Sequence, residues 1–193
     1  MYMKFCPDCG APNDVRIPDG DTRPRAVCPQ CAGIHYVNPK LVLGTIPVWE
    51  DQVLLCRRAI EPRYGMWTLP AGFMEVNEST ADGAMRETLE EAGAHVSLGP
   101  LFSVFDIPHV NQVHLFYLAR LENLDFAAGQ ESLEVRLFRE NEIPWETIAF
   151  RTITATLRFY FHDRRRGEMS VHTGDIREIE LPHDAQAALD RPA

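Results

Sequence analysis

The pattern of apolar and polar residues predicts β-strands through the middle of the chain. Residues 41–50 and 52–58 are two runs rich in leucine and β-branched residues, joined at Glu50-Asp51, and are expected to be neighbouring strands. Similar runs predict further strands at 96–105, 113–120 and 134–139. Polar stretches at 61–66 and 129–132 are predicted loops. The centre of the chain is therefore expected to be rich in β-structure.

Two stretches have helical rather than alternating spacing. The first can be capped by Ser79 or Thr80 and ended by Gly93, and one side of it is expected to pack: Ala81, Ala84, Met85, Thr88, Leu89 and Ala92. The second runs from Trp145 onward to about Gly167, with predicted core residues Ile153, Leu157, Tyr160 and Phe161. One strand and then a mobile tail are expected in residues 168–193.

The opposite side of the first helix carries Glu87, Glu90 and Glu91. These carboxylates lie near the end of the helix, where the macrodipole disfavours negative charge, and Glu87 and Glu91 form a like-charge pair one turn apart. Arg86 is the only nearby cation in sequence, and it can neutralise only part of this charge. A solvated acidic face is one interpretation. A bound divalent cation is the other, because it would offset a charge that otherwise destabilises the helix.

The N-terminal segment contains four cysteines in two C-x-x-C pairs: Cys6, Cys9, Cys28 and Cys31. Residues 10–27 separate the pairs, a spacing that allows two tight turns to share one tetrahedral Zn²⁺. Two disulfides are the alternative, but they require an oxidising compartment. Four thiolates leave no open coordination position, so the predicted zinc is structural. Cys56 lies in an apolar run and is expected to be a buried core thiol.

Composition limits the possible partners. The chain has 193 residues, 45% hydrophobic and 24% charged, and a net charge of −9. This charge argues against nonspecific binding to nucleic acid or to anionic membranes. No apolar run is long enough to predict a membrane span. Because the first residues lead directly into the cysteine motif, no signal peptide is expected and the predicted location is cytoplasmic.

The segment from Gly72 to Ala94 resembles the signature of the Nudix hydrolases: Gly, five residues, Glu, seven residues, then Arg-Glu-apolar-x-Glu-Glu-x-Gly-apolar. The matching residues are Gly72, Glu78, Arg86, Glu87, Glu90, Glu91 and Gly93. Thr88 and Ala94 depart from its apolar positions. The resemblance implies an α/β fold, the Nudix α/β/α sandwich with a mixed sheet. We therefore expect a zinc ribbon in residues 1–36, a Nudix domain in 37–167 and a C-terminal extension in 168–193.

The resemblance also implies roles for individual residues. Glu87 and Glu91, with Glu90 and the Gly72 carbonyl, are expected to hold Mg²⁺ or Mn²⁺ and to carry the catalysis. Arg86 and Glu78 are expected to form an ion pair that orients the helix and the loop before it. The expected general base is Glu131, with Glu134 or a box glutamate as the alternative. Two surface glutamates without a catalytic role are the other interpretation.

The segments around the signature narrow the resemblance. NADH pyrophosphatases also carry a zinc ribbon, but their Ser-Gln-Pro-Trp-Pro-Phe-Pro-like motif is replaced here by residues 101–109, LFSVFDIPH. Residues 35–40, 67–75 and 108–112 are more similar to ribbon-bearing bacterial hydrolases related to a plant chloroplast enzyme acting on FAD and ADP-ribose. The expected reaction is hydrolysis of the pyrophosphate of a nucleoside diphosphate linked to another moiety, giving AMP plus FMN or ribose 5-phosphate.

Three neutral polar residues, His109, Asn111 and Gln112, are expected to contact the substrate, unless they form only a polar hairpin tip. Two other functions remain open, an NADH pyrophosphatase and a non-catalytic module that senses nucleotides or binds nucleic acid. All glutamates of the signature are present, which argues against a sensor. Nucleic acid is not expected to be a partner, because the ribbon has few basic residues: Lys4, Arg16, Arg23 and Arg25. The resemblance also implies a possible homodimer.

Overall fold

The computed structural model describes residues 2–182, which form two compact units that divide after Pro39. The smaller unit has a three-stranded antiparallel sheet in the order β1-β2-β3: β1 Asp14–Arg16, β2 Arg25–Val27 and β3 Ile34–His35. Its buried side chains include only a few small or apolar groups, among them Ala26, Val27 and two of the cysteines. So small a core is typical of domains that need a metal or disulfides for stability.

The larger unit is built on one mixed sheet with the path β10-β5-β4-β9-β8-β11. Its strands are β4 Lys40–Trp49, β5 Gln52–Arg58, β8 Val96–Ile107, β9 Gln112–Leu121, β10 Ser132–Phe138 and β11 His172–Asp175. Two short strands, β6 Trp67–Thr68 and β7 Ala71–Phe73, pair with β5 and β4. The β4–β9 and β8–β11 pairs are parallel, and the other pairs are antiparallel.

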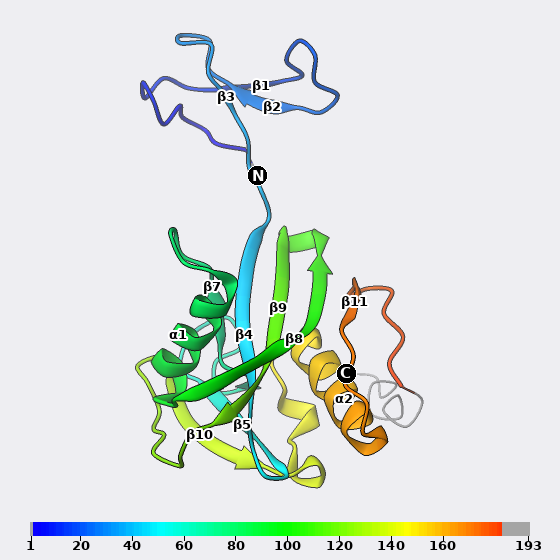
Figure 1. Cartoon of the computed structure of the whole chain (residues 1–193). Helices are drawn as coiled ribbons and strands as arrows, with labels where there is room; N and C mark the ends of the chain where they lie inside the picture. The colour runs from blue at the N-terminus through cyan, green and yellow to red at the C-terminus, as the bar shows by residue number, and fades with distance from the viewer. Residues whose placement is uncertain (1, 183–193) are drawn as a thin grey trace. The chain divides into compact units, whose positions relative to one another are not determined.

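Two α-helices cover opposite faces of this sheet, α1 Thr80–Ala92 and α2 Arg151–Arg166 (Figure 1). Alternate residues of β5 show the two faces: Val53 and Leu55 belong to the core beneath α2, whereas Leu54 and Cys56 pack with Ala92 of α1. Side chains alternate in this way because successive Cβ atoms of a strand point to opposite faces. The predicted α/β/α sandwich is therefore confirmed, and Cys56 is a buried thiol with 1% of its surface exposed.

Short 3₁₀ segments connect the main elements: η1 Pro108–Val110, η2 Glu140–Glu142 and η3 Trp145–Thr147. The predicted second helix is interrupted here, since α2 begins only at Arg151 and the residues from Trp145 form η3. Gly167 ends α2 in the left-handed conformation, as expected. The strand expected in the C-terminal extension is β11, and the expected mobile tail falls largely on residues 183–193, outside the described part.

Helix α1 begins and ends where the sequence predicts, but its buried side differs from the prediction. Ser79 caps the helix in a capping box with Asp82, and Gly93 closes it in the left-handed conformation. Leu89, predicted to pack, is 44% exposed, whereas Glu87 and Glu91 are buried. The cause is tertiary packing on the acidic side, where Gly129 N–H donates to the Glu91 carbonyl at 3.0 Å.

Thr88 suits its buried position although the signature has an apolar residue there. Its hydroxyl donates to the Ala84 carbonyl at 2.7 Å and accepts from Thr45 of β4, also at 2.7 Å. Both threonines are fully buried, so neither hydroxyl is left without a partner in the core. This hydrogen bond ties the middle of α1 to the centre of the sheet.

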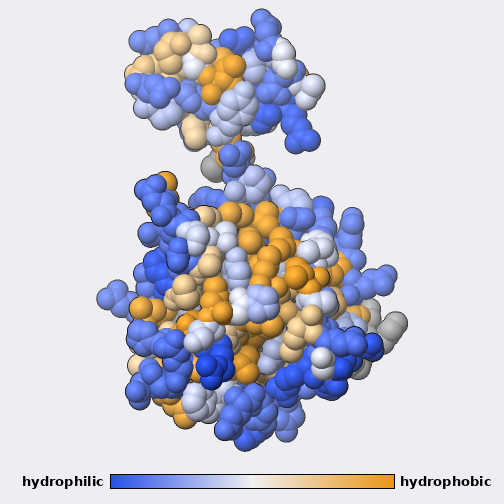
Figure 2. All heavy atoms as spheres, in the orientation of Figure 1, coloured by the Kyte–Doolittle hydropathy of each residue, from blue (hydrophilic) through white to orange (hydrophobic). Residues whose placement is uncertain are grey.

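No helix within residues 2–182 is long and apolar enough to cross a membrane. In the space-filling view of Figure 2, apolar residues of the larger unit form a band through the middle of the visible face, with hydrophilic residues around it.

Candidate active site

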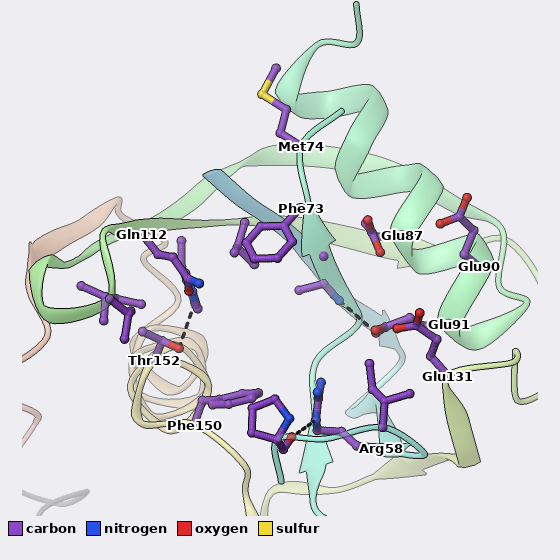
Figure 3. Close-up of a pocket in the computed structure, with 18 of the residues that line it drawn as sticks. Arg58, Phe73, Met74, Glu87, Glu90, Glu91, Gln112, Glu131, Phe150 and Thr152 are labelled. Atoms are coloured by element: carbon purple, nitrogen blue, oxygen red, sulfur yellow. Dashed lines mark hydrogen bonds between the residues drawn. The ribbon is translucent and has the colours of Figure 1, made fainter. Parts of the chain in front are cut away.

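Helix α1 presents Glu87 and Glu91 toward β7, where both side chains are largely shielded from solvent. Their exposed fractions are 9% and 7%, while the Glu90 side chain is 57% exposed. Glu91 accepts a hydrogen bond from the Ala71 backbone N–H at 3.1 Å. Gly72 makes the approach possible, because a Cβ at this position would lie 2.3 Å from the Glu87 carboxyl carbon. Figure 3 shows these glutamates facing one pocket from the helix.

Arg86 connects several acidic groups around the pocket. The ion pair expected with Glu78 is present, with nitrogen–oxygen distances of 2.9 and 3.0 Å. Another nitrogen of the same guanidinium lies 2.7 Å from Glu87 and 2.9 Å from Glu90. A further hydrogen bond reaches the Phe73 carbonyl at 3.1 Å. Arg86 thus joins the helix to the loop before it and neutralises more of the cluster than the sequence predicts.

The remaining negative charge affects proton binding at the buried glutamates. Burial raises the pKa of Glu91 to about 7, and the charges of Glu87 and Glu131 contribute less to the same shift. The hydrogen bond from the Ala71 N–H opposes it. Burial also raises the pKa of Glu87 despite its contact with Arg86. By contrast, the hydrogen bonds from Arg86 lower the pKa of Glu78 to about 2. The Glu87–Glu91 pair therefore has too little positive charge around it, which a divalent cation would supply.

Glu131 joins the same cluster from a distant part of the chain. The segment before β10 lies across the end of α1, where Ala127 N–H donates to the Ala92 carbonyl at 3.0 Å and a Cβ at Gly129 would lie 1.8 Å from the Glu90 carbonyl oxygen. This packing places the Glu131 side chain beside Glu91 in the pocket (Figure 3). The alternative, Glu134, lies on β10, makes a 3.7 Å ion pair with Arg57 and does not line this pocket.

The pocket has a volume of about 1240 Å³ and extends from these glutamates to η1, the start of β9 and the start of α2. His109 and Gln112, two of the three residues expected to contact substrate, line it. Asn111 does not line it: it has a positive φ of 54° at the turn after η1, and its carbonyl accepts from the Lys40 N–H at 2.9 Å. The structure therefore gives Asn111 a place in the turn rather than in the wall.

Several lining residues were not found from the sequence. Arg58 donates to the Pro62 carbonyl at 3.0 Å, and its guanidinium lies 5.1 Å from the centre of the Phe150 ring. Phe73 forms another part of the wall, and the buried His114 lies beneath Gln112 with Thr152 beside it. Burial lowers the pKa of His114 to about 4. These residues lie on separate elements and form no motif, although the alternation of Gln112 and His114 on β9 could have indicated a shared face.

The carboxylate oxygens of Glu87, Glu90 and Glu91 are too far apart in the structure to bind one ion together. Among residues 2–182, groups of three or more acidic, cysteine or histidine side chains with ligand atoms within 4.8 Å of one another occur only in the ribbon. Arg86 lies between Glu87 and Glu90, so these two side chains must reorient to share an ion with Glu91. The exposed Glu90 can do so at small cost, since its side chain is not packed.

The four ribbon cysteines form one compact group. Their sulfur atoms lie within 4.8 Å of one another, with 3.6 Å between Cys6 and Cys31 and 3.5 Å between Cys9 and Cys28. A tetrahedral Zn²⁺ with bonds of about 2.3 Å separates its sulfurs by about 3.8 Å, so the group fits zinc. All four are free thiols in the structure. The His35 ring nitrogen lies 3.2 Å from the Cys6 sulfur, close enough to orient it.

Comparison with known proteins matches both units. Residues 39–157 match the NUDIX domain model, and residues 4–37 match the zinc-ribbon model described as Nudix N-terminal. A NUDIX hydrolase structure from Nitrosomonas europaea is 53% identical with a TM-score of 0.86, covering 90% of this chain and 99% of that one. An ADP-ribose pyrophosphatase structure from Streptococcus suis is 22% identical with a TM-score of 0.58, covering 71% and 100%.

Curated relatives match at lower coverage. The NAD-capped RNA hydrolase NudC of Vibrio parahaemolyticus is 33% identical over 96 residues, which are 49% of this chain and 34% of the relative. The ADP-ribose pyrophosphatase of Methanocaldococcus jannaschii is 26% identical over 115 residues, 56% of this chain and 67% of the relative. The chain thus spans about a third of the length of the NAD-capped RNA hydrolase it matches. The matched models and the Nitrosomonas structure together show that this chain belongs to the Nudix hydrolases and carries their zinc-ribbon domain ahead of its Nudix domain.

Proposed function

We propose that this protein hydrolyses the pyrophosphate bond of a nucleoside diphosphate linked to another moiety, with FAD or ADP-ribose as substrate. The observation that carries the proposal is the buried pair Glu87 and Glu91 beside Glu131, at one end of the pocket. Three carboxylates in one partly desolvated site have a clear use if a divalent cation and a phosphate group bind there. The products are AMP with FMN, or AMP with ribose 5-phosphate.

Glu87 and Glu91, with Glu90 and the Gly72 carbonyl, would hold Mg²⁺ or Mn²⁺. When bound, such an ion neutralises charge on the phosphate oxygens and supplies an activated water. The chain itself fixes the position of Glu91 through the Ala71 N–H and gives Glu87 room through the missing side chain at residue 72. Arg86 holds the helix to the loop by its contacts with Glu78 and the Phe73 carbonyl.

Glu131 is the proposed general base. A general base must reach the attacking water, so it has to face the same space as the metal ligands. Glu131 lines the pocket and interacts electrostatically with both Glu87 and Glu91, whereas Glu134 is paired with Arg57 outside the lining. Glu131 adds negative charge beside Glu87 and Glu91, and burial together with this charge raises the pKa of both of these carboxyls.

The size and chemistry of the pocket support a large substrate with a ring system. Ligand pockets commonly measure about 300–1,000 Å³, and the volume of about 1240 Å³ here exceeds that range. Phe73 and Phe150 offer aromatic faces, and Arg58 adds a positive charge close to the glutamates. These features suit an adenylated compound with a second bulky half. NADH is the alternative substrate, and the relatives named NAD-capped RNA hydrolase add capped RNA to the compounds that need testing.

A substrate panel in heavy-oxygen water tests the proposal. FAD, ADP-ribose, NADH, NAD, CoA, dinucleoside polyphosphates and capped RNA are each incubated with Mg²⁺ or Mn²⁺. We expect the highest kcat/KM for FAD or ADP-ribose, with one labelled oxygen in a monophosphate product. Efficient turnover of NADH or capped RNA alone contradicts the substrate assignment. Turnover of no compound in the panel, by metal-loaded and folded protein, contradicts the function itself.

The ribbon is proposed to bind one structural Zn²⁺ through its four cysteines, because the site has no open position for a substrate. A homodimer stays a prediction from the family resemblance. The same holds for the expectation that nucleic acid is not a partner, which rests on the net charge of −9.

A further inference from the structure

A chain of hydrogen bonds runs beneath the end of the pocket that lies away from the glutamates. Gln112 begins β9, His114 follows on the same face of the strand, and Thr152 lies in the first turn of α2. The His114 ring nitrogens lie 3.0 Å from the Gln112 amide oxygen and 3.1 Å from the Thr152 hydroxyl. Figure 3 shows Gln112 and Thr152 on one side of the pocket and Glu87, Glu90, Glu91 and Glu131 on the other.

The hydrogen atoms in this chain can be assigned from the available partners. Thr152 is 3% exposed, and within residues 2–182 its hydroxyl has no hydrogen-bond partner other than His114 Nδ1. A buried hydroxyl that does not donate leaves a polar hydrogen unsatisfied, so Thr152 donates to Nδ1. The imidazole is neutral in this buried place, so its one proton is on Nε2 and is donated to the Gln112 amide oxygen.

This arrangement fixes which end of the Gln112 amide faces the substrate. With its oxygen occupied by His114, the amide turns its NH₂ group to the pocket, and that group has no partner among the described protein residues. The wall beside it includes the aromatic ring of Phe73 (Figure 3). A donor next to an aromatic face suits a flat heterocycle that carries a hydrogen-bond acceptor at its edge.

We propose that Gln112 determines specificity by donating its amide to an acceptor on the heterocyclic ring of the substrate, and that His114 and Thr152 are positioning residues that hold the amide in this orientation. The inference rests on the proposed hydrolysis of an adenylated compound. Adenine and flavin both carry ring acceptors, so they share the required chemistry. Removing the donor therefore weakens binding of the ring without changing the reacting groups at the other end of the pocket.

The proton assignment is tested without any substrate. Nitrogen-15 NMR of the protein at pH 7 is expected to show His114 as the neutral Nε2–H tautomer, with its signal identified by its loss in His114→Asn. A neutral Nδ1–H tautomer or a charged ring overturns the arrangement. Because no hydrolysis is involved, this result is independent of the proposed function.

The positioning role is tested with two equivalent threonines of α2. Thr152→Val removes the hydroxyl that donates to His114, whereas Thr156→Val removes a hydroxyl that is also buried and also 3.1 Å from its partner, Ser103 of β8, away from the pocket. We expect Thr152→Val to raise KM about tenfold, equivalent to about 1.4 kcal/mol, with kcat nearly unchanged. Thr152→Ser should restore KM, and Thr156→Val should leave it unchanged. Equal effects of both valine variants contradict the proposal.

The direction of the hydrogen bond is tested at Gln112 itself. Gln112→Met removes the donor and keeps a side chain of similar length. Gln112→Glu replaces the donor with an acceptor, and its carboxylate can still accept the hydrogen bond from His114. Affinities for AMP and FMN are measured, with ribose 5-phosphate as a control for the added charge. We expect Gln112→Glu to bind the affected ring more weakly than Gln112→Met, and the product affected shows whether the ring is adenine or flavin. Unchanged affinity of Gln112→Met for both AMP and FMN, when the parent protein hydrolyses the substrate, overturns this inference alone.

Discussion

The α-carbon of Gly72 lies against the carboxylate of Glu87, so closely that a Cβ would meet its carbon and oxygens at 2.3–2.4 Å. The contact joins the first and the central residues of the acidic signature across β7 and α1. It explains why a glycine is needed at this place, since its φ is not among the positive values that require one. The glycine makes room for the Glu87 side chain, which we propose as a metal ligand.

Gly72→Ala is therefore expected to displace Glu87 and reduce kcat/KM about 100-fold, because moving a catalytic group by about 1 Å can have this cost. The backbone conformation of residue 72 accommodates alanine, so we expect a large fall in kcat/KM with only a small fall in melting temperature. Measuring turnover and thermal melting on the same sample separates these effects. Full activity of a folded Gly72→Ala protein would show that Glu87 can function elsewhere.

Glu87→Gln and Glu91→Gln are each expected to reduce metal-dependent hydrolysis to near background. Both substitutions keep the shape of the side chain but remove a negative charge that would hold the cation. Titration with Mn²⁺ should show weaker binding in both variants, while circular dichroism should remain that of the parent protein. Turnover close to the parent with Mg²⁺ in either variant would eliminate that residue as a ligand.

Glu131→Gln and Glu134→Gln form a matched pair for the general base. Loss of a general base costs about 10²–10⁴-fold in rate, and we expect a loss of this size in kcat only for Glu131→Gln. Glu134 on β10 faces Arg57 of β5, so its substitution should change kcat less than about twofold, since a surface ion pair contributes little. A larger loss of kcat in Glu134→Gln than in Glu131→Gln would identify Glu134, on β10, as the general base.

Stability of the metal-free protein should depend on pH through Glu91. Its pKa is raised from 4.5 to about 7, so its contribution is fully present below pH 4.5 and is lost as pH rises through about 7. At 1.36 kcal/mol per pH unit the loss is at most about 3 kcal/mol. With excess chelator present, the melting temperature of the parent protein should fall between pH 5 and pH 8 by more than that of Glu91→Gln. Parallel curves for the two proteins would exclude an elevated pKa.

Cys6→Ser or Cys31→Ser is expected to unfold the ribbon before the Nudix core. Parent protein should contain one zinc per chain, and the variants should lose it together with protease resistance in residues 4–35. The core should keep its own melting transition, because contacts divide the chain after Pro39. Metal-free parent protein with four disulfide-bonded cysteines would contradict the zinc assignment.

The sequence predicts those parts of the site that lie within one segment. Glu87 and Glu91 could be found because one helix sets their spacing, and Ser79 and Gly93 mark its ends. Local periodicity failed where other segments decide burial: Glu87 and Glu91 are buried against Ala71 and Gly72 of β7, whereas Leu89 is exposed. Short strands such as β7 were also missed, since two or three residues carry no period.

The far wall of the pocket could not be predicted because sheet order creates it. His114 lies beside Thr152 only because β9 runs parallel to β4 in the middle of the sheet and α2 crosses that face. Their separation along the chain gives no signal of this meeting. Asn111 shows the reverse case: its polar side chain predicts binding, and its left-handed backbone also gives it a place in the turn after η1.

Arg86 has a consequence for how the protein exchanges its divalent ion with the surroundings. Since it contacts Glu78, Glu87 and Glu90 at once, the acidic helix carries part of its own counter-charge, and we expect it to keep its place in the fold as ions come and go. We therefore expect loading of the proposed divalent ion to be a reversible equilibrium of the folded chain. The fraction of enzyme ready to react follows the free concentration of the ion in its environment, as occupancy of a receptor follows its ligand.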